Sequence, residues 1–186
     1  TRTKLEALES AITRFVMTTG RLPCPADGAL SPTDTDYGRE SVATGLCNPN
    51  ELSNGVVPWR SLAVPQDAAT DAWGNHISYR VWAGVANSLT LANGMDMSLL
   101  DPANGTAVSD WLQTRGFRAC DGRNAPNCPA ADELARQIDG NGVAYFLISH
   151  GANKFAGYSP SGTLAPVNGP GPGPRENINR NGQLLR

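Results

Sequence analysis

The first twenty residues carry one apolar stripe at helical spacing, and this stripe restricts the fold more than any other part of the chain. Apolar positions separated by three and four residues share one face of an α-helix. They are Leu5, Leu8, Ile12, Phe15 and Val16, with Ala7 and Ala11 beside them. Gly20 suits the left-handed residue that ends a helix, and Pro23 and Pro25 prevent continuation. The spacing therefore predicts an amphipathic helix over residues 1–20 that needs a cover.

The amino end of this helix has only weak capping residues, Thr1 and Thr3, although the amphipathic pattern is already complete there. We therefore expect it to be the carboxyl-terminal half of a longer helix. Its polar face carries charges of both signs, which neighbouring molecules could use for pairing. The charged residues at its amino end are Arg2, Lys4, Glu6 and Glu9.

Residues 21–57 form a connecting loop that the sequence predicts to be mostly irregular, because turn signals recur every few residues. A loop of this length needs a tether in a compact domain. Cys24 and Cys47 bracket it and are the proposed tether.

The four cysteines are Cys24, Cys47, Cys120 and Cys128, and none forms the Cys-x-x-Cys pattern of zinc ribbons or thioredoxins. An even number of cysteines in a loop-rich chain favours disulfides and an oxidising compartment. Three pairings are possible. We favour the two local ones, Cys24–Cys47 and Cys120–Cys128, over the others and over four reduced core cysteines.

A sheet is expected within residues 58–167. Residues 76–82 alternate cleanly, so Ile77, Tyr79 and Val81 should face the helix while Ser78 and Arg80 face water. Residues 143–148 are the most apolar run in the chain and should form the central strand. Trp59 should pack onto the helix from the extended segment before the sheet.

The remaining segments complete a single domain over residues 1–186. Short helices are expected at residues 107–115 and 129–138, and edge strands at residues 155–159 and 163–167. Residues 168–186 form a Gly/Pro-rich tail, because prolines this dense do not fit a central strand.

No catalytic residue is expected. His150 lacks a suitably placed nucleophile, because Ser149 is its direct neighbour and adjacent side chains on a strand point to opposite faces. We interpret His150 as a hydrogen-bonded structural histidine at a strand end, and His76 as a turn residue.

No metal or other cofactor is expected either. Turn chemistry explains the acidic and amide clusters better than metal binding does, because their ligand patterns are incomplete. These clusters are Asp34, Asp36 and Glu40; Asp139 and Asn141; and Glu176, Asn177 and Asn179.

Composition and charge narrow the possible partners. Fifteen basic and 17 acidic residues give a net charge of −2, which provides no pull toward nucleic acid. The Gly-rich stretch at residues 169–174 is no phosphate loop, because its prolines lack N–H donors. No run reaches the roughly 20 apolar residues of a membrane span, and no secretory signal is present. The tryptophans are interpreted as side chains that anchor the core and the loops. A carbohydrate-binding or adhesive patch that uses Trp82 or Trp111 is the alternative.

The order of these elements resembles the soluble head of bacterial type IV pilin-like proteins, a group that includes minor pilins and type II secretion pseudopilins. Each matching stretch is short, and together they span most of the chain. The stretches are residues 5–20 with RLPCPADG at 21–28, VVPWR at 56–60, DAWGN at 71–75 with Tyr79 and Arg80, and FLISHGAN at 146–153.

The resemblance implies an α+β, pilin-like fold in which a long N-terminal helix packs on an antiparallel sheet with long disulfide-tethered loops. The packing residues would be Leu5, Leu8, Ile12, Phe15, Val16, Trp59, Ile77 and Tyr79. It implies a structural subunit, either pilin, minor pilin or pseudopilin, of a type IV pilus or type II secretion filament, and not an enzyme. Its partners would be other such subunits.

The family's cleavage site and hydrophobic helix are absent from this sequence. The resemblance implies that such a segment precedes residue 1, anchors the subunit in the inner membrane with its head in the periplasm, and later packs in a periplasmic or extracellular filament. The alternatives are a binding module on the filament, such as a tip adhesin or DNA-uptake minor pilin, and a hydrolase using His150.

Overall fold

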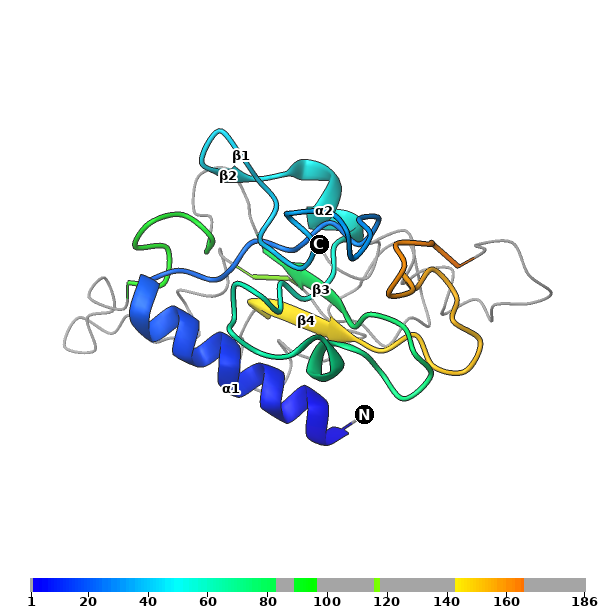
Figure 1. The fold of residues 1–186 in the computed structure, drawn as a ribbon. Helices are drawn as coiled ribbons and strands as arrows, with labels where there is room; N and C mark the ends of the chain where they lie inside the picture. Colours follow the sequence, from blue (N-terminus) through cyan, green and yellow to red (C-terminus); the bar gives the residue numbers. More distant parts are fainter. Residues whose placement is uncertain (1, 83–88, 97–115, 118–142, 166–186) are drawn as a thin grey trace, which may run out of the picture.

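The computed structural model describes residues 2–82, 89–96, 116–117 and 143–165 of the chain (Figure 1). Its longest element is helix α1, Arg2–Thr19, which nearly fills the stretch that the apolar spacing predicts. Gly20 ends the helix with a φ of +68°, and its N–H donates to the Val16 carbonyl at 2.8 Å. A left-handed residue here satisfies a carbonyl that the last turn would otherwise leave free.

Strands β3 (Ser78–Val81) and β4 (Tyr145–Ile148) pair antiparallel, with Ser78 opposite Ile148 and Val81 opposite Tyr145. Two single bridges widen this sheet, since Val56 pairs with Ser78 and with Ala26. Helix α1 runs along one side of the β3–β4 pair (Figure 1). The described residues therefore form an α+β arrangement with a small antiparallel sheet.

The hydrophobic core joins the helix to this sheet. Leu8, Ala11 and Ile12 are at most 1% exposed and share one cluster with Ile77 and Tyr79. Other apolar residues of the helix are half-buried against this cluster, namely Leu5, Phe15 and Val16. Trp59 lies in the same cluster. Burial of a large apolar side chain contributes about 1.5–3 kcal/mol, so this contact is a main source of stability.

The loop after the helix contains more regular structure than the sequence predicts. Strands β1 (Val42–Ala43) and β2 (Leu46–Cys47) form a hairpin. Helix α2 (Pro49–Asn54) follows, and the side chain of its N-cap Asn48 accepts the N–H of Asn50. One turn signal of this loop, Asn48-Pro49, is instead a cap followed by proline at the first helical position. A 3-10 helix, η1 (Gln66–Ala69), lies beside α1.

The prediction that Ser78 and Arg80 face water is wrong. Ser78 is 2% exposed and Arg80 is 8% exposed. Helix α2 contacts β3, and His150 reaches Ser78, so this polar face of the strand is covered as well. Alternation shows that the two faces of a strand differ in polarity, but it does not show that the polar face is wet.

The edge strands expected at residues 155–159 and 163–167 are present only as a short antiparallel contact in the described residues. Within residues 155–165 the pairing is reduced to a single bridge between Tyr158 and Leu164. Residues 151–156 form turns, and Lys154 and Ala156 have positive φ angles. The helices expected at 107–115 and 129–138 and the tail at 168–186 lie outside the described residues. No helix in the described ranges has the length and apolar character needed to cross a membrane.

Candidate functional site

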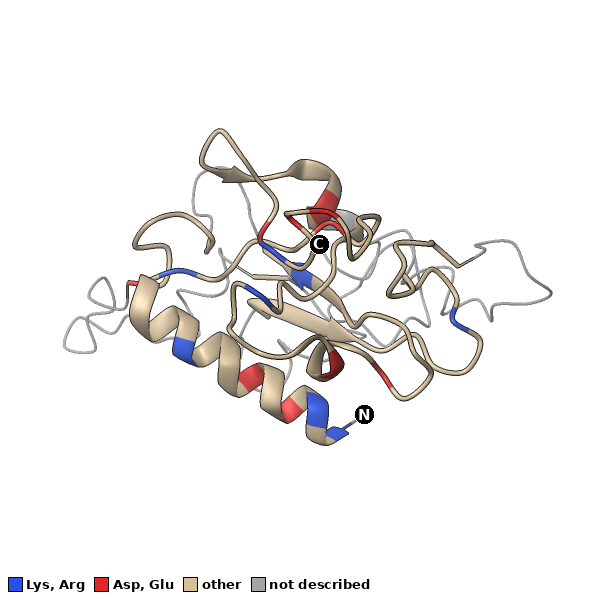
Figure 2. Cartoon of the chain, in the orientation of Figure 1, with Lys and Arg blue, Asp and Glu red and all other residues tan. Residues whose placement is uncertain are grey.

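Helix α1 has an outer face of exposed side chains that does not enter the core. Charges of both signs occur along it (Figure 2). Met17 is 81% exposed on this face, and Arg2 and Glu6 form an exposed ion pair at 3.1 Å. Such exposed pairs contribute little stability, so these side chains are free to rearrange. The exposed residues of this outer face include Arg2, Thr3, Glu6, Glu9, Ser10, Thr13, Arg14 and Met17.

Lys4 behaves differently from the other charged residues at this end of the helix. Its Nζ donates to the carbonyl of Asp67 at 2.8 Å and to the carbonyl of Thr70 at 3.0 Å. It also pairs with the Asp67 carboxylate at 3.0 Å. Lys4 therefore connects α1 to the end of η1 within the same molecule. This contact leaves the Lys4 side chain less available to a neighbouring molecule.

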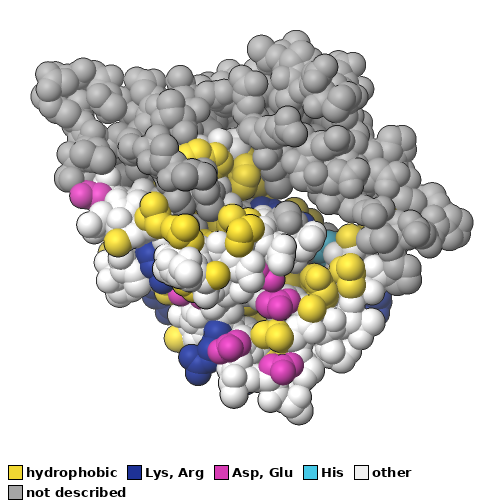
Figure 3. Space-filling model, turned by 90° about the horizontal axis from the view of Figure 1, so that it is seen from above, with side chains coloured by type: hydrophobic (Ala, Val, Ile, Leu, Met, Phe, Trp, Pro, Cys, Tyr) yellow, Lys and Arg dark blue, Asp and Glu magenta, His cyan; other side chains and the backbone are white. Residues whose placement is uncertain are grey.

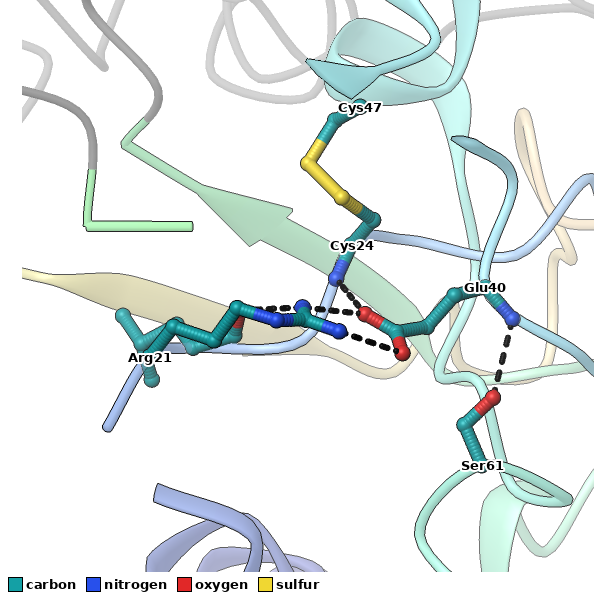
Figure 4. The surroundings of a disulfide bond; sticks show 6 residues. Arg21, Cys24, Glu40, Cys47 and Ser61 are labelled. Carbon is teal, nitrogen blue, oxygen red and sulfur yellow. Dashed lines mark hydrogen bonds and ion pairs between the residues drawn. A yellow bond between two sulfur atoms is a disulfide. The ribbon is translucent and has the colours of Figure 1, made fainter. Parts of the chain in front are cut away.

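The predicted disulfide Cys24–Cys47 is confirmed, with the two Cα atoms 5.2 Å apart (Figure 4). Both cysteines are almost completely buried. The bond ties strand β2 to the chain just after α1. Cys120 and Cys128, the other expected pair, lie outside the described residues.

An ion pair that the sequence did not reveal lies beside this disulfide (Figure 4). Arg21 Nη1 and Nη2 contact the two carboxylate oxygens of Glu40 at 2.7 and 3.1 Å. Glu40 also accepts the Cys24 N–H at 2.6 Å, and its own N–H donates to Ser61 Oγ at 3.0 Å. Bidentate geometry and partial burial make this pair stronger than a surface pair. Together the disulfide and the ion pair fix the loop at two points.

Two of the acidic residues weighed as metal ligands, Asp34 and Glu40, have other partners. Asp34 accepts the N–H and hydroxyl of Ser31 at 2.7 and 2.8 Å, and these hydrogen bonds hold its pKa below the usual value. Glu40 is occupied by Arg21. No group of three acidic, histidine or cysteine side chains suited to a metal occurs among the described residues. Asp139, Asn141, Glu176, Asn177 and Asn179 lie outside them.

His76 is a buried ring and not a simple turn residue. It is 1% exposed and stacks on Trp59 with ring centroids 4.6 Å apart. Its Nε2 lies 3.3 Å from the Tyr37 hydroxyl, which donates to the Pro160 carbonyl at 2.6 Å. Its Nδ1 is buried and has no hydrogen-bond partner among the described residues. Burial lowers the pKa of His76 to about 4, so the ring is neutral at pH 7.

His150 meets a serine that the sequence analysis did not consider. Its Nδ1 lies 2.7 Å from the Phe155 carbonyl, and its Nε2 lies 2.7 Å from Ser78 Oγ. A carbonyl can only accept, so Nδ1 carries the proton and neutral Nε2 accepts from Ser78. Serine and base are thus in contact, and Ser78 is 2% exposed. The arrangement acts as a structural clamp.

Asp71 organises the turn before β3 and joins it to the end of β4. Its Oδ1 accepts the N–H groups of Trp73 and Asn75 at 2.9 and 3.0 Å, and its Oδ2 accepts the Ser149 hydroxyl at 2.9 Å. Burial raises its pKa, but these hydrogen bonds outweigh burial and the pKa is lowered. Ser149 therefore has a structural partner in Asp71.

Two opposite charges are buried on the polar side of β3. Within the part of the chain that the structure describes, Arg80 Nη1 and Glu51 Oε2 each lack a hydrogen-bond partner. Burial, followed by the nearby carboxylate of Asp27, raises the pKa of Glu51. Burial also lowers the pKa of Arg80 to about 10, which leaves it charged at pH 7. The covered face of the sheet is thus unusually polar.

The surface shows no single dominant patch on the described part of the face seen in Figure 3, where apolar side chains form several groups separated by polar atoms. Trp73 is 44% exposed in the Asp71 turn, whereas Trp82 is half-buried against the core. Trp111 lies outside the described residues. No family model matches the chain, and no curated protein or solved structure shows significant similarity to it.

Proposed function

We propose that this chain is the head of a structural subunit, either pilin, minor pilin or pseudopilin, of a type IV pilus or type II secretion filament. The observation that carries the proposal is the division of α1 into two faces. One face packs against the core residues contributed by β3 and its neighbours. The opposite, outer face of the same helix is exposed. A helix of this kind can hold its own head and still contact neighbouring subunits.

The tethered loop is consistent with the same role. A disulfide and a bidentate ion pair fix residues 21–47 beside the end of α1, so the surface next to the helix keeps one shape. Disulfides persist in oxidising compartments, which fits a head in the periplasm before assembly and in a filament afterwards. On this proposal an apolar helix precedes residue 1 and anchors the subunit in the inner membrane, and its partners are other subunits.

The direct test is filament incorporation. The full-length gene product, carrying a carboxyl-terminal epitope tag, is expressed in its own bacterium, and surface and periplasmic filaments are isolated. The proposal expects the tag in the filament fraction. A tagged protein that stays out of every filament fraction in the wild-type strain would contradict the proposal.

A matched pair of charge reversals tests whether the outer face of α1 makes the contacts. Arg14→Glu changes an exposed position on α1, and Lys154→Glu changes an exposed position in a distant turn. Both heads should fold, as judged by circular dichroism. We expect Arg14→Glu to lower incorporation and Lys154→Glu to leave it unchanged. Equal incorporation of the two variants would show that Arg14 on the outer face of α1 makes no contact needed for assembly.

A further inference from the structure

Met17 and Trp73 are large apolar side chains that stay exposed, and they lie at opposite ends of α1. Met17, in the last turn of α1, is 81% exposed, and Trp73 is 44% exposed. The Trp73 turn, residues 71–75, lies near the amino end of α1, because Lys4 Nζ donates to the carbonyl of Thr70, just before the turn, at 3.0 Å (Figure 1). Met17 follows Lys4 by 13 residues, which is about 20 Å along a helix. One copy of the chain therefore cannot bring the two side chains together.

Hydrogen bonds within the Trp73 turn fix its shape. Asp71 Oδ1 accepts the N–H groups of Trp73 and Asn75 at 2.9 and 3.0 Å, and the Asp71 N–H donates to the Asn75 carbonyl at 2.8 Å. Gly74 has a φ of +80°, which lets the chain reverse there. Tryptophan is enriched among the residues that carry most of the binding energy of interfaces, and a backbone that is already ordered lowers the entropic cost of binding. The turn is therefore suited to contact a partner.

The two ends carry complementary charges. Asp67, whose side chain is 86% exposed, precedes the Trp73 turn, and Asp71 lies within it, so two carboxylates accompany the single ammonium group of Lys4. At the other end, Arg14 is exposed one turn before Met17, and residues three apart share one side of a helix. A guanidinium group can contact an indole ring and also pair with a carboxylate. The Arg14–Met17 surface therefore complements the Trp73 turn in charge and in apolar character.

We propose that the Arg14–Met17 surface of one copy packs against the Trp73 turn of a second copy. Met17 lies against the indole ring, a favourable contact between sulfur and an aromatic ring, and Arg14 pairs with Asp67. The inference rests on the proposed function, in which subunits contact one another, and it names the two surfaces that meet.

A contact between two different surfaces can repeat without limit. After two copies join, one still presents its Trp73 turn and the other its Arg14–Met17 surface, so a third copy can bind at either end. Such a contact gives an open filament unless the rotation between copies closes a ring, whereas a contact between identical surfaces stops at a dimer. The separation of the two surfaces along α1 is therefore consistent with a filament subunit.

Cross-linking within filaments tests this contact. Thr18→Cys and Ala72→Cys, at exposed positions beside Met17 and Trp73, are introduced together into the full-length gene product in its own bacterium. Isolated filaments are treated with a short bismaleimide. We expect a ladder of dimers, trimers and longer chains on a denaturing gel, because each copy is joined at two positions. Either substitution alone should give only the pattern of the wild-type chain, whose own cysteines set the background.

A matched control uses Leu46→Cys together with Ala72→Cys, because Leu46 is 53% exposed on the β1–β2 hairpin, outside the proposed contact. An equally strong ladder from this control pair would overturn the inference. The absence of a ladder from Thr18→Cys with Ala72→Cys, in filaments that contain this variant, would also overturn it and would leave the proposed function standing. A wild-type chain that enters no filament would contradict both.

An exchange of charges identifies the groups, and it decides the question if the cysteine variants stay out of filaments. Arg14→Glu and Asp67→Arg should each lower incorporation about tenfold, because each places like charges across the contact. The two changes together should restore most of the loss, since the pair forms again in reverse. Circular dichroism checks that Asp67→Arg, which also loses an exposed ion pair with Lys4, still folds.

The control for this exchange combines Arg14→Glu with Asp36→Arg, which reverses an exposed acidic residue elsewhere in the chain. This combination should restore nothing. Equal recovery in the two double variants, or recovery in neither, would refute the proposal.

Discussion

At the scale of single residues, Gly38 and Gly45 separate two reasons why a position requires glycine. Both have a positive φ, +74° and +82°, which costs energy for any residue with a Cβ. A Cβ added at Gly38 would fall on the indole ring of Trp59, whereas a Cβ added at Gly45 meets nothing within 4 Å. Gly38 thus satisfies a backbone and a packing requirement together, and Gly45 only the first.

Alanine at these two positions should therefore have unequal effects on stability. Both variants carry a left-handed penalty of about 1–2 kcal/mol. Gly38→Ala should lose about 1–3 kcal/mol more, because the buried Trp59 ring has to shift. Urea unfolding followed by tryptophan fluorescence measures both. An equal loss in the two variants would mean that Trp59 moves aside without cost.

At the scale of elements, the contact between α1 and the sheet is formed by apolar side chains on one stripe. Ile12 is 1% exposed within this contact, and the next residue, Thr13, is exposed and bonds only to the Glu9 carbonyl one turn earlier among the contacts described. The two positions therefore separate the intrinsic tendency of the helix to form from the stability that it gains by docking.

Ile12→Ala should lower the free energy of unfolding by about 2–5 kcal/mol, because it leaves a cavity between helix and sheet. Thr13→Ala should change it by no more than about 0.5 kcal/mol. Chemical denaturation curves for the two variants provide the comparison. A small effect of Ile12→Ala would show that the helix contributes little to the core.

At the scale of the whole molecule, the described part of the chain has only small sheets. Contacts between residues distant in sequence therefore hold its loops in place. The disulfide closes a separation of 23 residues. Arg21 and Glu40 pair across 19 residues, and Lys4 reaches Asp67 across 63. These links hold loops that bury little apolar surface, and they set which surfaces lie next to α1.

Replacing both Cys24 and Cys47 by serine should cost about 3 kcal/mol, because the unfolded chain regains the freedom of a closed loop. The backbone of residues 25–47 should then move more freely, so trypsin should cleave faster at Arg39, whose side chain is already exposed. Limited proteolysis with mass spectrometry measures the cleavage rate, and cleavage at Arg14 within α1 provides the internal control. Identical rates at Arg39 in variant and wild type would show that the other contacts hold the loop without the disulfide.

Local pattern was sufficient for the parts of the fold that depend on neighbouring residues. The spacing of Leu8 and Ile12 predicted α1, and Gly20 predicted its end, because helical periodicity and capping act within a few residues. The cysteines that bracket a long loop predicted Cys24–Cys47. The short helix α2 was missed, since Asn48-Pro49 is compatible with a turn as well as with a cap.

The polar interior was beyond the reach of the sequence, because side chains meet there across long separations. Ser78 and His150 are 72 residues apart, and nothing in either local pattern indicates the other. Alternation correctly placed Ser78 and Arg80 together on the polar face of the strand. It wrongly predicted that this face is exposed, because the segments that cover it come from elsewhere in the chain. Periodicity therefore specifies which side chains share a face, and folding alone specifies what covers that face.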